Sequence, residues 1–188
     1  MRIVAIADTH LNTWKIPEKL KELLEDADLV VHAGDFDKYE IYKKFNSNFE
    51  LIAVQGNSDE DKIKRILPKV QIFKIENVKF GVVHKGNYLN QFHDLGYRAK
   101  ELGVDFLIFG HIHRFVLDRL KDVTLLCPGS PTMPRLSVAS CAEIVVEGKN
   151  VSVKHHIVQN LFCGMDVYKM LTTKAHHFSN KTSKGDDR

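Results

Sequence analysis

Short apolar runs and amphipathic segments alternate along the first half of the chain. The apolar runs are rich in β-branched residues, which favour strands, and the segments between them space their apolar residues at helical intervals. Strands that alternate with helices predict a parallel sheet covered by helices. The predicted strands span residues 2–7, 28–34 and 49–56, and the predicted helices span residues 16–27, 38–45 and 60–67.

The second half changes to a pattern dominated by short strands. Two apolar runs flank Glu76-Asn77 and predict a hairpin, and a helix is expected over about Gln91 to Leu102. Together the two halves predict an α/β fold of two sheets packed face to face, each with helices outside. The expected strands of this half span residues 70–75, 78–84, 104–113, 115–120, 123–127, 141–147 and 150–158.

A single domain is expected over residues 1–158, followed by a C-terminal extension over residues 159–188. From about Thr172 the extension is polar and lacks periodicity, which predicts a loosely ordered tail. No run of apolar residues approaches the length of a membrane span, and the short N-terminal run is interrupted at Asp8, unlike a signal peptide.

Composition places the 188-residue chain among ordinary globular proteins, with 44% hydrophobic and 27% charged residues. The net charge is +3 and the basic residues are scattered, so nucleic-acid binding is not indicated. The three cysteines, Cys127, Cys141 and Cys163, are odd in number and form no close pair. This usage favours a reducing, cytoplasmic location over a disulfide framework.

Five of the first six predicted strands end in Asp, Asn or His, often beside a glycine. Each group has a plain structural explanation, because Asp8 and Asp35 could cap helices and Asn57 and Asp59 could form turns. Ligands of open α/β sheets bind beyond the carboxyl ends of the strands, and five such coincidences together favour a binding site. The groups are Asp8-Thr9-His10, Gly34-Asp35, Gly56-Asn57-Ser58-Asp59, His84 and Gly110-His111-Ile112-His113.

The chemistry of these groups indicates a metal site. On a strand, His111 and His113 would point to the same face, although a His-x-His pair alone is a weak signal. Carboxylate, imidazole and amide ligands without sulfur suit Mn, Fe, Zn or Ni, and seven side chains suffice for two ions. Asp35 could bridge them, and a water between two such ions would become a nucleophile near neutral pH. The seven candidates are Asp8, His10, Asp35, Asn57, His84, His111 and His113.

The order Asp-x-His, Gly-Asp, Gly-Asn, His and Gly-His-x-His resembles that of the calcineurin-like metallophosphoesterases. The short chain, with its "GNSD" and "PGS" stretches, is similar to the small YfcE-like phosphodiesterase group over about Met1 to Val158. The resemblance implies a four-layer sandwich of two mixed β-sheets with flanking helices. It also implies a cytoplasmic dimer or tetramer that hydrolyses phosphate esters, diesters in preference to monoesters.

The resemblance also assigns roles to the seven residues. One of two divalent ions, with Mn expected first and Ni, Fe or Zn as alternatives, would be held by Asp8, His10, Asp35 and His113. The other would be held by Asp35, Asn57, His84 and His111, with Asp35 shared. The catalytic residues would be Asp35, Asn57 and His84, acting with a hydroxide that bridges the ions.

The chain departs from the family pattern at two places. The usual His-Gly-His is replaced by His84-Lys85-Gly86-Asn87, and Lys85 could face either a phosphate or solvent. Residues 131–135 of the "PGSPTMPR" stretch are unusual, so the contribution of that loop stays open. A retromer scaffold subunit shares the expected fold with an impaired metal site. That protein-binding role is the alternative function, although a scaffold has no need of seven intact ligands.

The other histidines receive no functional role. His32 lies within a predicted strand and is expected to pack in the core or behind the ligands. His93 is expected on a solvated helix face. The pairs His155-His156 and His176-His177 fall in the last strand and the tail.

Overall fold

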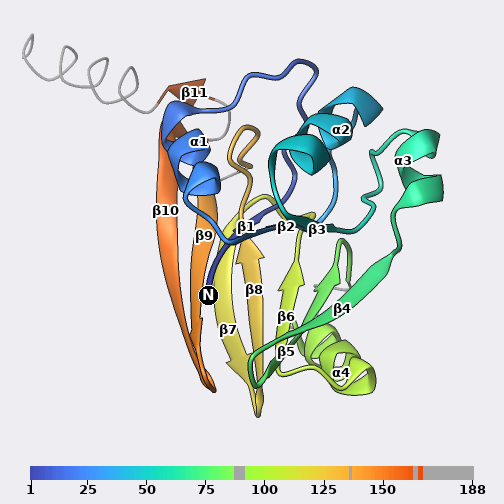
Figure 1. The fold of residues 1–188 in the computed structure, drawn as a ribbon, viewed down its shortest axis with the longest axis vertical. Coiled ribbons are helices and arrows are strands. Elements are labelled where there is room, and N and C mark those ends of the chain that lie inside the picture. The colour runs from blue at the N-terminus through green and yellow to red at the C-terminus, as the bar shows by residue number, and fades with distance from the viewer. Residues whose placement is uncertain (87–91, 136, 163–164, 167–188) are drawn as a thin grey trace, which may run out of the picture.

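The computed structural model describes residues 1–86, 92–135, 137–162 and 165–166, and within them eleven strands form two mixed sheets (Figure 1). The expected fold class is therefore confirmed. The strands are β1 (Arg2–Ile6), β2 (Leu29–His32), β3 (Leu51–Ala53), β4 (Val70–Ile75), β5 (Val78–Val83), β6 (Phe106–Phe109), β7 (Phe115–Leu120), β8 (Val123–Pro128), β9 (Val138–Glu147), β10 (Asn150–Phe162) and β11 (Met165–Asp166). The helices are α1 (Glu18–Glu25), α2 (Tyr39–Asn48), α3 (Asp61–Ile66) and α4 (His93–Leu102).

Each sheet combines a parallel part with an antiparallel part. The first sheet has the order β11-β10-β9-β1-β2-β3, in which β1, β2 and β3 are parallel and β9 is antiparallel to β1. The second sheet has the order β4-β5-β6-β8-β7, in which β5, β6 and β8 are parallel. The antiparallel pair β4–β5 is the hairpin that the sequence predicted.

Successive residues of the central strands enter different apolar layers. On β2, Leu29 and Val31 lie in the core between the two sheets, whereas Val30 lies under the helices of the first sheet. This alternation follows from the two-residue period of a strand, and it explains why the strand reads as a continuous apolar run. Phe80 and Ile108 supply the opposite side of the central core from the second sheet.

Helices cover the outer face of each sheet, as the sequence analysis expected (Figure 1). The buried faces of α1, α2 and α3 lie on the first sheet through residues such as Leu20, Phe45 and Ile63. The second sheet is covered by α4, whose Leu95 and Ala99 pack on β5 and β6. Both sheets therefore bury apolar residues on both faces, and the four layers place the polar loops at the ends of the strands.

Several predicted strands end earlier than expected, because β1 ends at Ile6, β2 at His32 and β3 at Ala53, and the difference that matters most is at β6. β6 stops at Phe109, so the prediction of a strand continuing through His113 is wrong. His111 and His113 have φ angles of 76° and 55°, in the left-handed region that no strand can contain. The two rings therefore do not share a strand face, and their positions are set by a loop.

Smaller differences concern segment ends. Helix α4 begins at His93, and Gln91, where its start was expected, lies outside the described residues. The short strand β11 was not anticipated. The expected tail from about Thr172 also lies outside the described residues. Among the residues that the structure does describe, no helix is long and apolar enough to cross a membrane.

Candidate metal centre

All seven candidate ligands follow the carboxyl ends of parallel strands. Asp8 and His10 follow β1, and the next two loops of the same sheet contribute Asp35 and Asn57. From the facing sheet, His84 follows β5, and His111 and His113 follow β6. Because the two sheets pack face to face, these five loops meet at one end of the sandwich.

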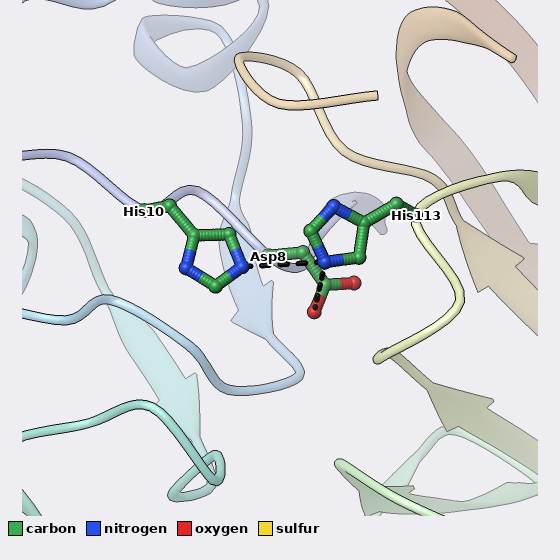
Figure 2. Close-up of side chains that lie close together, drawn as sticks. All are labelled: Asp8, His10 and His113. Carbon is green, nitrogen blue, oxygen red and sulfur yellow. Dashed lines mark hydrogen bonds and ion pairs between the residues drawn. The ribbon is translucent and has the colours of Figure 1, made fainter. Parts of the chain in front are cut away.

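The first group of potential ligands contains Asp8, His10 and His113, whose ligand atoms lie within 4.8 Å of one another. Figure 2 shows the two imidazole rings, which are stacked with centroids 4.9 Å apart, beside the Asp8 carboxylate. The Nε2 atoms of His10 and His113 are 3.3 Å apart, and Nε2 of His113 is 3.7 Å from Asp8 Oδ1. Asp8 and His113 are buried.

The second group contains Asp35, His84 and His111, again within 4.8 Å of one another. Nε2 of His84 lies 3.3 Å from Asp35 Oδ2 and 3.1 Å from Asn57 Oδ1. The rings of His84 and His111 meet edge to face. Asn57 is exposed, so this group opens toward solvent.

Asp35 lies between the two groups. Its Oδ2 atom is 3.6 Å from Nε2 of His10 in the first group and 3.3 Å from Nε2 of His84 in the second. Its other oxygen accepts a hydrogen bond of 2.9 Å from the amide of Ser58. The groups are further linked because the amide of His111 donates to both oxygens of Asp8, at 3.0 and 2.9 Å.

The orientation of the histidine rings fits a bound cation. Nδ1 of His10 faces Asp37 Oδ1 at 2.8 Å, and Nδ1 of His113 faces the carbonyl oxygen of Met133 at 2.5 Å. These partners accept protons, so each Nδ1 is a donor, and the Nε2 atom of each ring points toward the Nε2 atom of the other. Two atoms that bind one ion at about 2.1 Å lie about 3.0–3.4 Å apart, which matches this 3.3 Å separation.

His84 has the same arrangement. Its Nδ1 donates to the carbonyl oxygen of Ala33 at 2.8 Å, which turns Nε2 toward the oxygens of Asp35 and Asn57. Histidines that bind metals characteristically donate the other ring N–H to a carbonyl or carboxylate. The donor set and its orientation therefore fit divalent ions at both groups.

The first group is electrostatically unsuited to burial without an ion. Burial raises the pKa of Asp8 to about 7, and the charge of nearby Asp35 raises it further, against lowering by His84. Burial lowers the pKa of His113 to about 4. The protein without metal therefore favours a neutral acid beside a neutral imidazole, and a divalent ion would favour the carboxylate instead.

The second group has the character of an ion pair. Burial acts to raise the pKa of Asp35, but hydrogen bonds from His84 and Ser58 outweigh it and hold that pKa well below its usual range. Burial lowers the pKa of His84, yet the hydrogen bond and charge of Asp35 raise it overall. A proton on Nε2 of His84 would thus occupy the place of a cation between these side chains.

Strained backbone accompanies the candidate ligands. Five of the seven have positive φ angles, from 43° at His10 to 76° at His111. A left-handed residue other than glycine costs about 1 kcal/mol or more, and such residues cluster at functional sites. The strain indicates that the surrounding contacts hold these side chains in place. The strained candidates are Asp8, His10, Asp35, His111 and His113.

Glycine is required where the loops approach each other most closely. A Cβ atom on Gly56 would collide with the Asp35 carboxylate, and one on Gly34 would lie 2.8 Å from Nδ1 of His84. Gly34 also has a φ of 89°, which other residues rarely adopt. These glycines allow the second group to assemble.

Two aspartates have roles that the sequence did not reveal. Asp37 accepts from Nδ1 of His10, and Asp59, expected to be a turn residue, is buried. The Asp59 carboxylate accepts from the amides of Phe36 at 2.6 Å, Asp37 at 2.9 Å and Gly56 at 2.7 Å. It therefore joins the loop after β2 to the loop after β3. In the sequence, the roles of Asp37 and Asp59 were indicated only by their closeness to Asp35 and Asn57.

The loop of residues 129–135 encloses the first group. The Ser130 hydroxyl donates to the carbonyl of Asp8 at 2.7 Å and accepts from the amide of Met133 at 2.8 Å. Met133 in turn accepts from His113, and Thr132 donates to the carbonyl of Thr9. The loop thus supports the candidate ligands through its backbone and hydroxyl groups.

Lys85 and Arg135 are exposed cations beside the centre. Lys85 follows His84 after the end of β5, and it lines a hollow with Val70 and Leu95, which pack on the outer side of the sheet. The charge of Arg135 acts on Asp8, His113 and His111, lowering the pKa of each. The charge of Arg135 therefore acts on residues of both groups, whereas that of Lys85 acts on His111, where it lowers the pKa more than Arg135 does.

Comparison with known proteins shows the family. The family model described as "Calcineurin-like phosphoesterase superfamily domain" matches residues 1–149. A probable metallophosphoesterase of Methanocaldococcus jannaschii is 36% identical over 157 residues, covering 79% of this chain and 78% of the relative. A protein of the same organism named as a phosphodiesterase is 29% identical over 143 residues, covering 69% of this chain and 83% of the relative.

Solved structures agree on the fold. Vps29 from Entamoeba histolytica is 23% identical, covers 82% of this chain and 91% of its own, and has a TM-score of 0.72 in a single-mutant form. Its wild-type complex with Zn²⁺ has a TM-score of 0.69. The chain belongs to the calcineurin-like phosphoesterase superfamily, and its potential metal ligands occupy one end of the fold.

Proposed function

We propose that the protein is a dinuclear metal-dependent phosphoesterase that prefers phosphodiesters. The observation that carries this proposal is the convergence of two groups of acceptor atoms with Asp35 between them. Carboxylates and imidazole nitrogens gathered in a buried site repel one another unless protons or cations lie among them, and divalent cations suit this donor set. The family membership supplies the reaction class, phosphate-ester hydrolysis.

Each ion would have its own ligand set. Asp8, His10, Asp35 and His113 would hold one, and Asp35, Asn57, His84 and His111 would hold the other. Divalent ions, with Mn²⁺ expected first and Ni²⁺, Fe²⁺ or Zn²⁺ as alternatives, would polarise the phosphate and lower the pKa of a water toward about 7.

The residues of the chain would orient the reactants. Asp35, held by the Ser58 amide and by contacts to both groups, would set the separation of the two cations. Asn57 directs its carbonyl oxygen at His84, which leaves the exposed side of its amide to donate to a phosphate oxygen. His84, fixed through the carbonyl of Ala33, would keep a deprotonated Nε2 toward the second ion.

The preference for diesters rests on the resemblance to the YfcE-like group and on one relative named as a phosphodiesterase. Larger phosphatases of the superfamily place a histidine directly after the Gly-Asn pair, where it is thought to protonate the leaving oxygen. Here that residue is Ser58, a far weaker acid. We therefore expect a steep dependence of rate on leaving-group pKa, since general acid catalysis contributes about 10²–10⁴-fold.

The test combines metal content with activity. The chelated and Mn²⁺-loaded protein would be assayed for ions per chain and for hydrolysis of bis(4-nitrophenyl) phosphate, alongside diesters with more basic leaving groups. His111→Ala should lose one ion and most activity. His93→Ala, which removes an exposed histidine at the start of α4, should change neither.

The outcomes separate the candidate functions. Activity that survives chelation, together with no bound metal, would exclude the proposal. Two bound ions without hydrolysis of any diester or monoester, whichever ion is loaded, would favour the protein-binding scaffold. A flat leaving-group profile would mean that a residue other than Ser58 supplies the proton.

A further inference from the structure

His32 lies behind the candidate ligands and touches none of their side chains through a hydrogen bond. It is the last residue of β2, and its side chain is fully buried on the helix-covered face of the first sheet. Its ring stacks on Phe36, with centroids 3.6 Å apart, and meets Phe45 edge to face. A polar ring in such surroundings is costly unless both nitrogens are hydrogen-bonded.

Both nitrogens of His32 have partners, and the partners define the tautomer. The amide of Gly34 donates to Nδ1 at 3.2 Å, so Nδ1 carries no proton. The proton is therefore on Nε2, which donates to the Thr9 hydroxyl at 3.0 Å. Thr9 in turn donates to the carbonyl of Asp35 at 3.4 Å. Burial lowers the pKa of His32 well below its usual value, which keeps the ring neutral.

This chain of hydrogen bonds connects two ligand loops. Thr9 lies between Asp8 and His10, whereas Gly34 directly precedes Asp35. Backbone bonds run alongside, from the amide of Asp8 to Gly34 at 3.0 Å and from the amide of His10 to Asp35 at 3.1 Å. All three ligands in these loops have left-handed backbone, which persists only where neighbouring contacts hold it.

We propose that His32 is a positioning residue that holds the loop bearing Asp8 and His10 in register with the loop bearing Asp35. The link brings Asp35 within reach of both metal groups. This role rests on the proposed function and extends it to a residue that binds neither ion nor substrate.

The role depends on hydrogen bonding as well as on packing. An apolar residue of similar size would keep the contact with Phe36, but it would leave the Thr9 hydroxyl without its donor and the Gly34 amide without its acceptor. A buried donor or acceptor left unpaired costs about 1–3 kcal/mol. The ligand loops would then shift to find other partners, and the spacing of the ligands would change.

The test separates positioning from stability. Mn²⁺ affinity would be measured by chelator competition, with kcat and KM on bis(4-nitrophenyl) phosphate and the unfolding midpoint of the metal-free protein. The variants are His32→Leu, His32→Gln and Thr9→Val, with the double variant of His32→Leu and Thr9→Val. Phe36→Leu is the control, because it removes the stacking partner and leaves the hydrogen bonds.

We expect His32→Leu and Thr9→Val each to weaken Mn²⁺ binding about tenfold or more and to lower kcat. The double variant should bind Mn²⁺ no more weakly than the more impaired of the two single variants, because each substitution removes the same His32–Thr9 hydrogen bond. His32→Gln, which retains a donor toward Thr9, should recover part of the affinity. Phe36→Leu should lower the unfolding midpoint and change affinity less than about threefold.

Additive losses in the double variant, or an equal loss of affinity in Phe36→Leu, would overturn the positioning role. If His32→Leu fails to fold, the isosteric Thr9→Val decides, and unchanged Mn²⁺ affinity in it would also overturn the role. Measurements on the native protein distinguish the positioning role of His32 from the proposed function. If the native protein neither binds metal nor hydrolyses phosphate esters, the proposed function itself is contradicted.

Discussion

The two groups of potential metal ligands differ in how the protein tolerates them without an ion. In the first group, burial raises the pKa of Asp8 to about 7 and lowers that of His113 to about 4, in a site supported by Asp37 and the backbone of Met133. In the second group Asp35 and His84 form an ion pair at a site that opens to solvent near Asn57. The first group stays stable by keeping a proton on a carboxyl, and the second by holding one on a histidine.

The difference between the groups shows which proton a metal ion has to displace on binding. Binding at the first group requires Asp8 to lose a proton, and binding at the second requires His84 to lose one. The second group also depends on fewer contacts from the 129–135 loop, whose hydroxyl and backbone bonds reach Asp8, Thr9 and His113. The two groups should therefore respond differently to substitution and to pH.

The largest effect is expected for Asp35→Ala, which removes the carboxylate between the two groups. Both ions should bind more weakly, and hydrolysis should fall by about 10³-fold or more, since metal ions contribute several kcal/mol to such reactions. Metal analysis and the kcat of bis(4-nitrophenyl) phosphate hydrolysis measure this. Asp122→Ala, in the exposed turn after β7, is the control. Loss of only one ion would contradict the bridging position.

Asp59→Ala should act through stability. The substitution leaves three backbone amides without their acceptor, and each such loss costs about 1 kcal/mol or more, so the free energy of unfolding should fall by about 3 kcal/mol. Denaturant unfolding of the metal-free protein measures this, with the exposed Asp61→Ala as control. Unchanged stability with loss of an ion would instead make Asp59 a ligand.

Asp8→Asn should change how stability depends on pH. Because burial raises the pKa of Asp8 from 3.8 to about 7, the folded protein keeps a proton that the unfolded chain releases between these values. Stability of the metal-free native protein should therefore fall as pH rises from about 4 to 7. The variant lacks this titration, so its unfolding midpoint should rise relative to the native one across that window.

His84 does not obscure this comparison. Its pKa is raised above 6.5, so the stability that it contributes is lost as the pH rises from about 6.5, which is mostly above the window of Asp8. Unfolding midpoints in excess chelator, at intervals from pH 4 to pH 9, separate the two effects. A constant difference between native and Asp8→Asn protein would show that Asp8 does not titrate in this range.

The smallest effect is expected for the two exposed cations. Arg135→Gln should raise the KM for a phosphodiester about threefold, because an exposed charge contributes 1 kcal/mol or less. Lys85→Gln should leave KM unchanged, since Lys85 lines the hollow beside Val70 and Leu95. Equal changes in KM would place both charges at the substrate.

The sequence indicated which polar residues follow the buried strands, and the structure places all seven candidates after strand ends. Apolar runs define the strands, and a polar residue after a buried strand emerges at its carboxyl end, as Asp8, Asp35 and His84 do. These are local properties, because strand and loop patterns depend on neighbouring residues. The domain boundary near residue 158 and the loose tail stay predictions.

Only the tertiary structure decided how the side chains meet. His10 and His113 are 103 positions apart, and His113 depends on Met133 and His10 on Asp37 for ring orientation. The sequence placed His111 and His113 on a strand, whereas left-handed backbone turns them into a loop. Such orientations arise from long-range contacts between loops of two sheets. The sequence by itself therefore located the candidate ligands after the strands, and tertiary packing determined their geometry.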